Sequence, residues 1–247
     1  MVSSKKALRI KLFQETACYK KPLAFKAGET YPLPPFSTIK GMLHHVMDAN
    51  EFIPMNISVQ GDYECSFKEY QTHYFYRQKA INKGLGQAPI TIKTQVENDL
   101  TRDNNMISTS PITKYVLKDV TLIIHVIAEE EVLQKLQTAL NECSFISLGA
   151  AEYLVRIDEV AITELRPIKE DIEMQFNCYI RREQIMELDL NCVPFSLCWK
   201  YEIVNGTREW EKIEAGYVKK GQLLFDTDDI LVDDENNPAF LCLPVND

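Results

Sequence analysis

The residues best suited to chemistry lie between positions 30 and 47, in the sequence TYPLPPFSTIKGMLHHVM. Its prolines hold the chain extended, because proline fixes φ and disfavours helix in the preceding residue. Ser37 or Thr38 is then expected to cap a helix. The first backbone N–H groups of a helix bind anions, so the pattern predicts a phosphate site there, with Lys40 and His44 beside it.

That helix is expected over residues 37–49. Lys40, His44 and Asp48 lie four apart and are expected on its solvent-exposed face. Taken alone, the pattern is more typical of an ordered loop that leads into a helix than of a binding site. The apolar residues recur at the spacing of one buried stripe: Ile39, Met42, Leu43, Val46 and Met47.

Two further motifs give the first one a context. The sequence ALRIKLFQETACYKKP occupies residues 7–22, and SLGAAEYLVRI occupies residues 147–157. In this order the three motifs resemble the Cas-five family of CRISPR-associated proteins, the RAMP-type subunits of type I Cascade complexes. Their spacing is most similar to the type I-B branch. The resemblance covers residues 6–165; it fades between residues 77 and 111 and again after residue 166.

The resemblance implies a non-catalytic Cascade subunit that binds the 5′ handle of crRNA and helps to assemble the complex for target DNA recognition. Its implied partners are the crRNA 5′ handle, the Cascade backbone subunit, the Cascade large subunit and target DNA within the complex. Backbone N–H groups would meet phosphates, lysines would neutralise charge, and an aromatic residue would stack on a base. The expected RNA-binding residues are Lys20, Lys21, Tyr31, Ser37, Thr38, Lys40, His44, Arg77, Lys79, Lys83, Ser147, Leu148 and Gly149.

The predicted elements follow the order β-α-β-β-α-β with an insertion. Two helices on a four-stranded antiparallel sheet form a ferredoxin-like, RRM-like α+β domain, and the resemblance implies the same fold. We expect this domain over residues 1–165, with a thumb hairpin inserted at about 77–112 and a β-rich C-terminal extension over 166–247. Strands are predicted at residues 8–13, 55–60, 64–76, 114–128 and 153–157, and the second helix begins near residue 129.

Two of these strands predict where a site would lie. In residues 8–13, alternate positions are apolar and join the core. The second half of residues 114–128 is continuously apolar, which predicts a buried central strand with His125 packed or hydrogen-bonded inside it. The other face of the first strand is basic and aromatic, as on an open sheet that binds RNA: Arg9, Lys11 and Phe13.

The polar insertion and the C-terminal region carry fewer signals. The insertion includes Arg77, Lys79 and Lys83; the resemblance implies a thumb that grips guide RNA, and an unstructured surface loop is the alternative. Asn205-Gly206 favours a two-residue hairpin turn after the alternating residues Trp199, Tyr201 and Ile203, with a returning strand over residues 207–213. The acidic residues 226–237 are expected to form a solvated loop.

Charge and composition indicate a cytoplasmic protein with one basic half. The net charge is −9, but residues 1–125 hold 16 Lys/Arg and 11 Asp/Glu, whereas residues 126–247 hold 11 and 25. A phosphate-binding surface requires local basic groups rather than a basic whole. No apolar run approaches the ~20 residues of a membrane span, and no secretory segment opens the chain. Seven cysteines without a C-x-x-C pair predict reduced thiols, and no metal or cofactor is expected.

Catalysis is the main alternative to simple binding. Metal-free RNA cleavage requires a base and an acid, commonly His, Tyr or Lys, and in the type I-C branch of the family the protein cuts repeat RNA with these residue types. The histidines are His44, His45, His73 and His125, and none forms a Lys-His pair after the insertion. We therefore expect no catalytic residue. A metal-independent endoribonuclease for CRISPR repeat RNA stays open, as does an unrelated ferredoxin-like domain.

Overall fold

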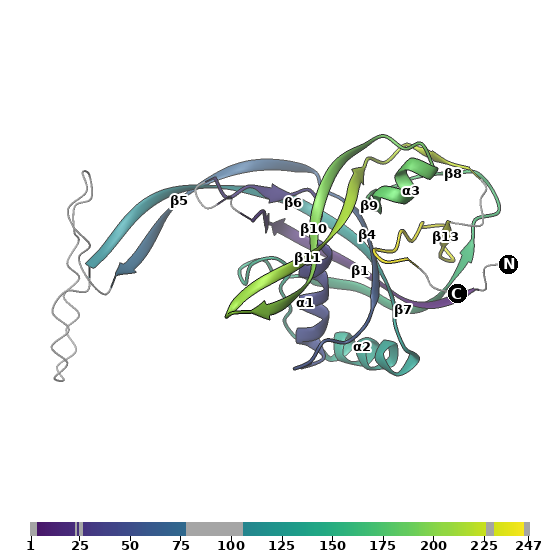
Figure 1. The fold of residues 1–247 in the computed structure, drawn as a ribbon, viewed down its shortest axis with the longest axis horizontal. Coiled ribbons are helices and arrows are strands. Elements are labelled where there is room, and N and C mark those ends of the chain that lie inside the picture. Colours follow the sequence, from purple (N-terminus) through teal and green to yellow (C-terminus); the bar gives the residue numbers. More distant parts are fainter. Residues whose placement is uncertain (1–3, 23, 25–26, 78–105, 226–229, 245–247) are drawn as a thin grey trace.

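The computed structural model describes residues 4–22, 24, 27–77, 106–225 and 230–244. The chain has a mixed α/β fold dominated by strands (Figure 1). Its largest sheet has the strand order β10-β11-β9-β4-β6-β1-β7-β13, with β5 paired to the outer part of β6. No helix of the described residues is long and apolar enough to cross a membrane.

Four strands form the centre of this sheet: β1 (Lys5–Ala17), β4 (Asn56–Asp62), β6 (Met106–Ile127) and β7 (Arg156–Pro167). Every neighbouring pair is antiparallel, in the order β4-β6-β1-β7. The predicted central, buried strand is confirmed, because β6 lies between β1 and β4 and its residues 122–126 are buried. Ile10 of β1 lies opposite Ile124 of β6, so the alternation in the sequence sets one face of the sheet into the core.

Two helices cover that face: α1 (Phe36–Val46) and α2 (Glu130–Glu142). The α2 prediction is confirmed, since Leu133, Leu136 and Leu140 are buried against the sheet. The predicted cap of α1 is wrong. Pro35 is the N-cap residue, and its carbonyl oxygen accepts the Thr38 N–H at 2.9 Å, so neither Ser37 nor Thr38 caps the helix. The helix begins earlier because the fully buried Phe36 anchors its first turn in the core.

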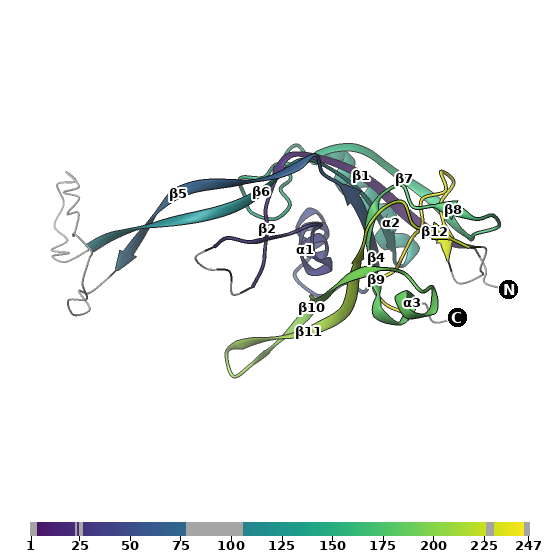
Figure 2. The same cartoon turned by 90° about the horizontal axis from the view of Figure 1, so that it is seen from above.

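A long two-stranded arm projects from the body (Figures 1 and 2). It consists of β5 (Cys65–Arg77) and the first part of β6, paired from Cys65 opposite Lys118 to Arg77 opposite Met106. Strand β5 begins before the predicted insertion at 77–112, and β6 ends after it, so the two strands of the arm connect the insertion to the body. Lys79 and Lys83 lie outside the described residues.

The C-terminal half extends the same sheet at both edges. On one side, β9 (Asn177–Arg181), β11 (Thr207–Val218) and β10 (Cys192–Val204) follow β4. The predicted hairpin between β10 and β11 is confirmed; both Asn205 and Gly206 have positive φ, as a tight two-residue turn requires. On the other side, β13 (Leu231–Val232) pairs with β7.

The remaining elements are short. The helix α3 (Arg182–Glu187) follows β9. The strand β2 (Tyr19–Lys20) pairs with β3 (Thr30–Tyr31), and β8 (Ile172–Glu173) pairs with β12 (Leu223–Leu224).

Candidate nucleic-acid interface

The basic face of β1 is covered by the C-terminal segment rather than open to RNA. Arg9 is buried, and its guanidinium contacts Glu159 at 2.8 Å and Asp233 at 2.9 Å. Lys11 contacts Glu235 at 2.7 Å. The predicted RNA-binding face is therefore wrong, because acidic side chains that follow β13 neutralise it.

Asp233 is the centre of this buried cluster. One of its carboxylate oxygens accepts hydrogen bonds from Arg9, His125 and Asn237, and the other accepts the N–H groups of Glu235 and Asn237. Burial alone would favour the neutral acid, but these donors outweigh it, so the pKa of Asp233 lies well below its ordinary value. Part of the acidic stretch that the sequence predicted to be a solvated loop therefore packs against the sheet, where Asp233 is buried. His125 is hydrogen-bonded inside its strand, as expected.

The α1 face predicted to be exposed is partly covered: Lys40 and His44 are half-buried, whereas Asp48 is exposed. The β10–β11 hairpin lies beside α1 in both ribbon views (Figures 1 and 2). The Lys40 ammonium donates to the carbonyl oxygen of Trp199 at 2.5 Å and lies 4.4 Å from the centre of the Trp199 ring and 4.9 Å from that of Phe52. This burial lowers the pKa of Lys40 to about 8. Ser37, Lys40 and His44 line one groove of about 480 Å³ here, which we call the helix–hairpin groove.

The two ring nitrogens of His44 are both occupied by backbone groups. The Ile53 N–H donates to Nε2 at 3.0 Å, so Nε2 must be an acceptor, and Nδ1 then carries the proton and donates to the Lys40 carbonyl oxygen at 2.8 Å. Burial also lowers the pKa of His44, which favours this neutral form. His44 therefore ties the end of α1 to the following segment, and only its ring face, stacked on Phe52, adjoins the groove.

The loop at residues 147–149 packs against the body of the protein. Leu148 is buried, and its carbonyl oxygen accepts a hydrogen bond from Gln14 at 3.1 Å. Gly149 has φ +96°, and a Cβ at this position would lie 2.8 Å from the carbonyl oxygen of Cys18. The close approach that this glycine permits is thus to the backbone beside β2. This geometry gives Gly149 a packing role, and its contact with RNA stays a prediction.

Lys20 and Lys21 lie at the base of the arm, where Lys20 is exposed and Lys21 contacts Glu29 at 3.2 Å. Tyr31 is buried edge-on against Phe195, with its pKa raised by burial, so it packs in the core instead of offering a face to a base. The side chains of Arg77 and of residues 74–76 lie outside the described part of the structure.

A cationic and aromatic surface lies along the arm, and only its Lys21 was predicted from the sequence. A groove of about 310 Å³ separates Lys21 from Tyr115 of β6. Beyond it, Lys68 lies 5.2 Å from the centre of the Tyr115 ring, and Tyr70, on the same face of β5, is 72% exposed. We call Lys21, Lys68, Tyr70 and Tyr115 the arm surface. The signal available in the sequence was the alternation of Lys68 and Tyr70 with Phe67 and Glu69.

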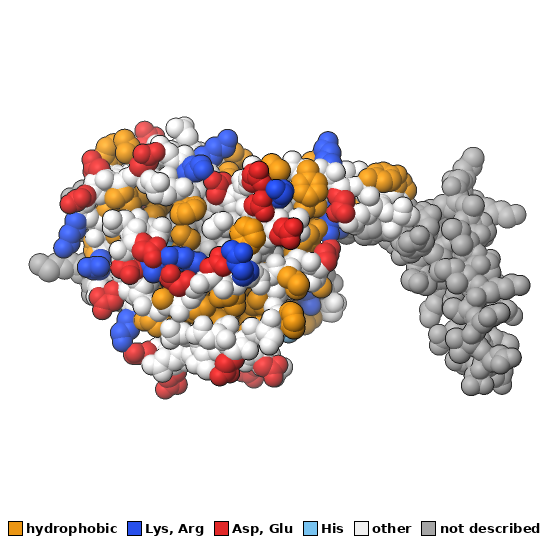
Figure 3. All heavy atoms as spheres, turned by 180° about the vertical axis from the view of Figure 1, so that it is seen from behind, with side chains coloured by type: hydrophobic (Ala, Val, Ile, Leu, Met, Phe, Trp, Pro, Cys, Tyr) orange, Lys and Arg blue, Asp and Glu red, His pale blue; other side chains and the backbone are white. Residues whose placement is uncertain are grey.

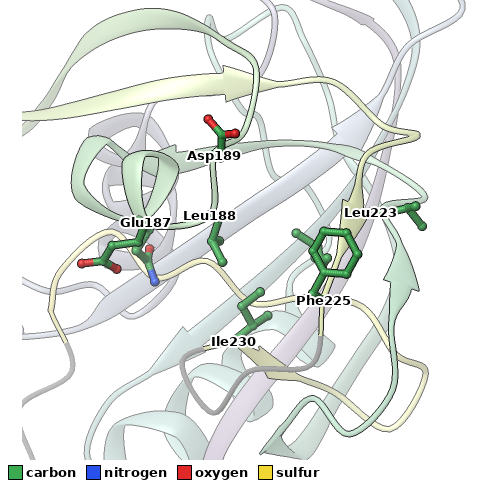
Figure 4. A pocket seen from close by; sticks show the side chains of 8 residues that line it. Glu187, Leu188, Asp189, Leu223, Phe225 and Ile230 are labelled. Atoms are coloured by element: carbon green, nitrogen blue, oxygen red, sulfur yellow. The ribbon is translucent and has the colours of Figure 1, made fainter.

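Elsewhere, basic side chains are interspersed with acidic ones, as Figure 3 shows for the rear face of the molecule. A pocket of about 380 Å³ beside α3 is lined by apolar side chains with Glu187 and Asp189 (Figure 4). Its described lining contains no lysine or arginine, so this pocket is unsuited to phosphate. Among the residues that the structure describes, no group of three or more His, Cys, Asp or Glu side chains is placed to hold a metal ion.

Comparison with known proteins establishes the family. The model of the family described as CRISPR-associated protein (Cas_Cas5) matches residues 7–211, and the chain belongs to this family. The resemblance found in the sequence is confirmed at that level; its type I-B assignment stays a prediction. No curated protein matches the sequence.

One solved structure supports the fold. A chain described as "CRISPR RNA-guided surveillance complex" is similar with a TM-score of 0.53 and 13% identity, over 88% of this chain and 91% of that chain. A CRISPR protein from Archaeoglobus fulgidus has a TM-score of 0.46 and 10% identity, over 97% of this chain and 100% of that chain. A structure described as "Crystal structure of Cas protein" has a TM-score of 0.43 and 12% identity, over 94% and 98%.

Proposed function

We propose that this chain is a non-catalytic subunit of a type I-B-like Cascade complex that binds the 5′ handle of crRNA and helps to assemble the complex for target DNA recognition. The observation that carries the proposal is the family match over residues 7–211. The strand order β4-β6-β1-β7 with two helices on one face supports the finer assignment of a ferredoxin-like domain. The partners would be the backbone and large subunits of the complex, which the similar fold of a surveillance-complex chain supports.

The arm surface is the best candidate for the RNA contact. Lysines bind phosphates, and exposed aromatic rings stack on unpaired bases. Lys21 and Lys68 supply the charge, and Tyr70 and Tyr115 supply the rings. The arm projects from the body, so RNA bound along it would also remain accessible to neighbouring subunits (Figure 2).

Two of the described histidines, His44 and His125, support binding over cleavage, whereas His45 is exposed. A general base must present a free nitrogen to the 2′-hydroxyl. Both nitrogens of His44 are engaged by backbone groups, and His125 is fully buried beside Asp233. Neither side chain is arranged to take a proton from RNA.

One assay separates the two functions. Purified full-length protein is incubated in EDTA with end-labelled repeat RNA from the CRISPR array of its own host, and binding and integrity of the RNA are followed on native and denaturing gels. We expect a shifted, intact RNA. A single cut that His45→Ala or His73→Ala abolishes would establish an endoribonuclease instead. Failure to shift the RNA would contradict direct handle binding.

A further inference from the structure

The helix–hairpin groove presents aromatic rings from two separate parts of the chain. Phe52 follows α1, whereas Tyr201 and Trp210 face each other across β10 and β11 with ring centres 5.0 Å apart. These rings are only half-covered: 50% of Phe52, 41% of Tyr201 and 39% of Trp210 is exposed. Exposed aromatic faces in a groove of this size suit a flat ring rather than a chain of small side chains.

Lys40 supplies the groove with a positive charge whose hydrogen-bond donors are not all used by the described residues. An ammonium has three N–H donors, and among the described residues the Lys40 ammonium donates one hydrogen bond, to the Trp199 carbonyl oxygen. Lys200, beside it, contacts Glu211 at 3.1 Å. Among the described residues no carboxylate lies within ion-pair distance of Lys40. Its remaining donors therefore suit an anionic ligand.

We propose that the helix–hairpin groove binds one unpaired nucleotide of an RNA strand, with the base on Trp210 or Phe52 and a phosphate against Lys40. This inference rests on the proposed RNA-binding function and adds a second subsite, separate from the arm surface.

An apolar protein segment is a poorer occupant of the same groove. Covering Lys40 with apolar atoms would bury its charge further without a counter-charge, which is unfavourable. A nucleotide supplies both the anionic group and the flat ring. An acidic peptide would satisfy Lys40 but would leave the aromatic faces without a ring to stack on.

The chain offers its own reporter of this groove. Its two tryptophans, Trp199 and Trp210, both line it. The full-length protein is titrated with unlabelled oligouridine and oligoadenosine RNA while tryptophan emission is recorded, and affinities are measured in parallel from the anisotropy of labelled RNA. The variants are Trp210→Ala, the conservative Trp210→Phe, and Lys40→Met. The control is Phe145→Ala, which removes an aromatic ring that is 83% exposed and lies outside the groove.

We expect RNA to change the emission saturably and Trp210→Ala to lower affinity by about 5- to 150-fold, the effect of losing one stacked base. Trp210→Phe should retain most of the wild-type affinity, and Phe145→Ala should leave affinity unchanged. Lys40→Met lowers the slope of log affinity against log salt by ~0.7, the effect of one phosphate contact on a single strand.

Three results would overturn the inference. If RNA binds but neither the emission nor the Trp210→Ala affinity changes, the groove is not an RNA subsite and the proposed function stands. If polyglutamate changes the emission and RNA does not, the groove binds an acidic protein segment. If the wild-type chain binds no RNA at all, both this subsite and direct handle binding fail.

Discussion

Removing the carboxylate of Asp233 should detach the C-terminal segment from the sheet. Its side chain is fully buried and holds Arg9 at 2.9 Å and His125 at 3.0 Å, together with two backbone N–H groups. Breaking a buried ion pair by deleting one partner costs about 3 to 5 kcal/mol. In a chain of this size each kcal/mol lowers Tm by about 2 to 4 °C, so Asp233→Ala should lower Tm by about 6 to 20 °C.

Asp234→Ala is the matched control. Asp234 contacts the same Arg9 guanidinium at 2.5 Å, but its side chain is 57% exposed. An ion pair with a solvent-exposed carboxylate contributes about 0 to 1 kcal/mol, and Arg9 keeps Glu159 and Asp233 as partners, so the control should lose less than about 4 °C. Thermal unfolding followed by circular dichroism at pH 7 compares the two variants. Equal losses would refute the reasoning, because the burial of Asp233 would then contribute nothing.

The pH dependence gives an independent check of the same cluster. The pKa of Asp233 is depressed in the folded state, so its stabilisation is present above the ordinary carboxyl pKa and is lost as pH falls toward the folded value. The Tm difference between wild type and Asp233→Ala should be constant from pH 5 to pH 7 and should shrink below about pH 4. A difference that grows on acidification would contradict this assignment.

Three further variants test other parts of the structure. Gly149→Ala should lower Tm more than Gly206→Ala, because both glycines have positive φ but only the Gly149 Cβ would meet backbone, at 2.8 Å; equal losses would show that the contact with Cys18 is unimportant. The RNA affinity of Gly149→Ala should fall only in parallel with its Tm. A loss of affinity without a matching loss of Tm would show that Gly149 belongs to the RNA site. Lys40→Met should raise Tm at pH 7, because the folded pKa of Lys40 is lowered to about 8 and the charged form is therefore penalised below that pH. The Tm advantage of Lys40→Met should shrink as pH rises from 8 toward 10.5, because in this range wild-type Lys40 is charged in the unfolded state and neutral in the folded state. A pH-independent Tm difference would contradict this reasoning. Lys68→Glu on the arm surface should weaken RNA binding, measured by anisotropy, and lower the single-strand salt slope by ~0.7, whereas Lys135→Glu on the exposed face of α2 should change neither; equal effects would mean that the arm surface makes no specific contact.

The elements that local patterns specify could be predicted from the sequence. The apolar period of residues 130–142 predicts the buried stripe of α2, and the continuous apolar run of β6 predicts its central place in the sheet. Asn205-Gly206 predicts the turn of the β10–β11 hairpin, because both residues tolerate positive φ. These features depend on neighbours close in the chain.

The site was predicted less well because contacts distant in sequence decide it. The period of α1 shows which face meets the sheet, but it cannot show that a hairpin covers the other face. Lys40 and Trp199 are 159 residues apart. Arg9 and Asp233 are 224 residues apart, and only their pairing reveals that the basic face of β1 is neutralised. In both places a later segment covers a charged side chain that the sequence predicts to be exposed: Arg9 is buried and Lys40 is half-buried.

Direct identification of the bound RNA tests the central claim. The tagged full-length chain is purified from its native host under conditions that preserve complexes, and any RNA that accompanies it is sequenced from its 5′ end. We predict crRNA with one uniform 5′ end derived from the CRISPR repeat, recovered together with a repeated backbone subunit and a large subunit. Recovery of the chain as a well-behaved monomer without RNA, or with RNA of random 5′ ends, would contradict the account.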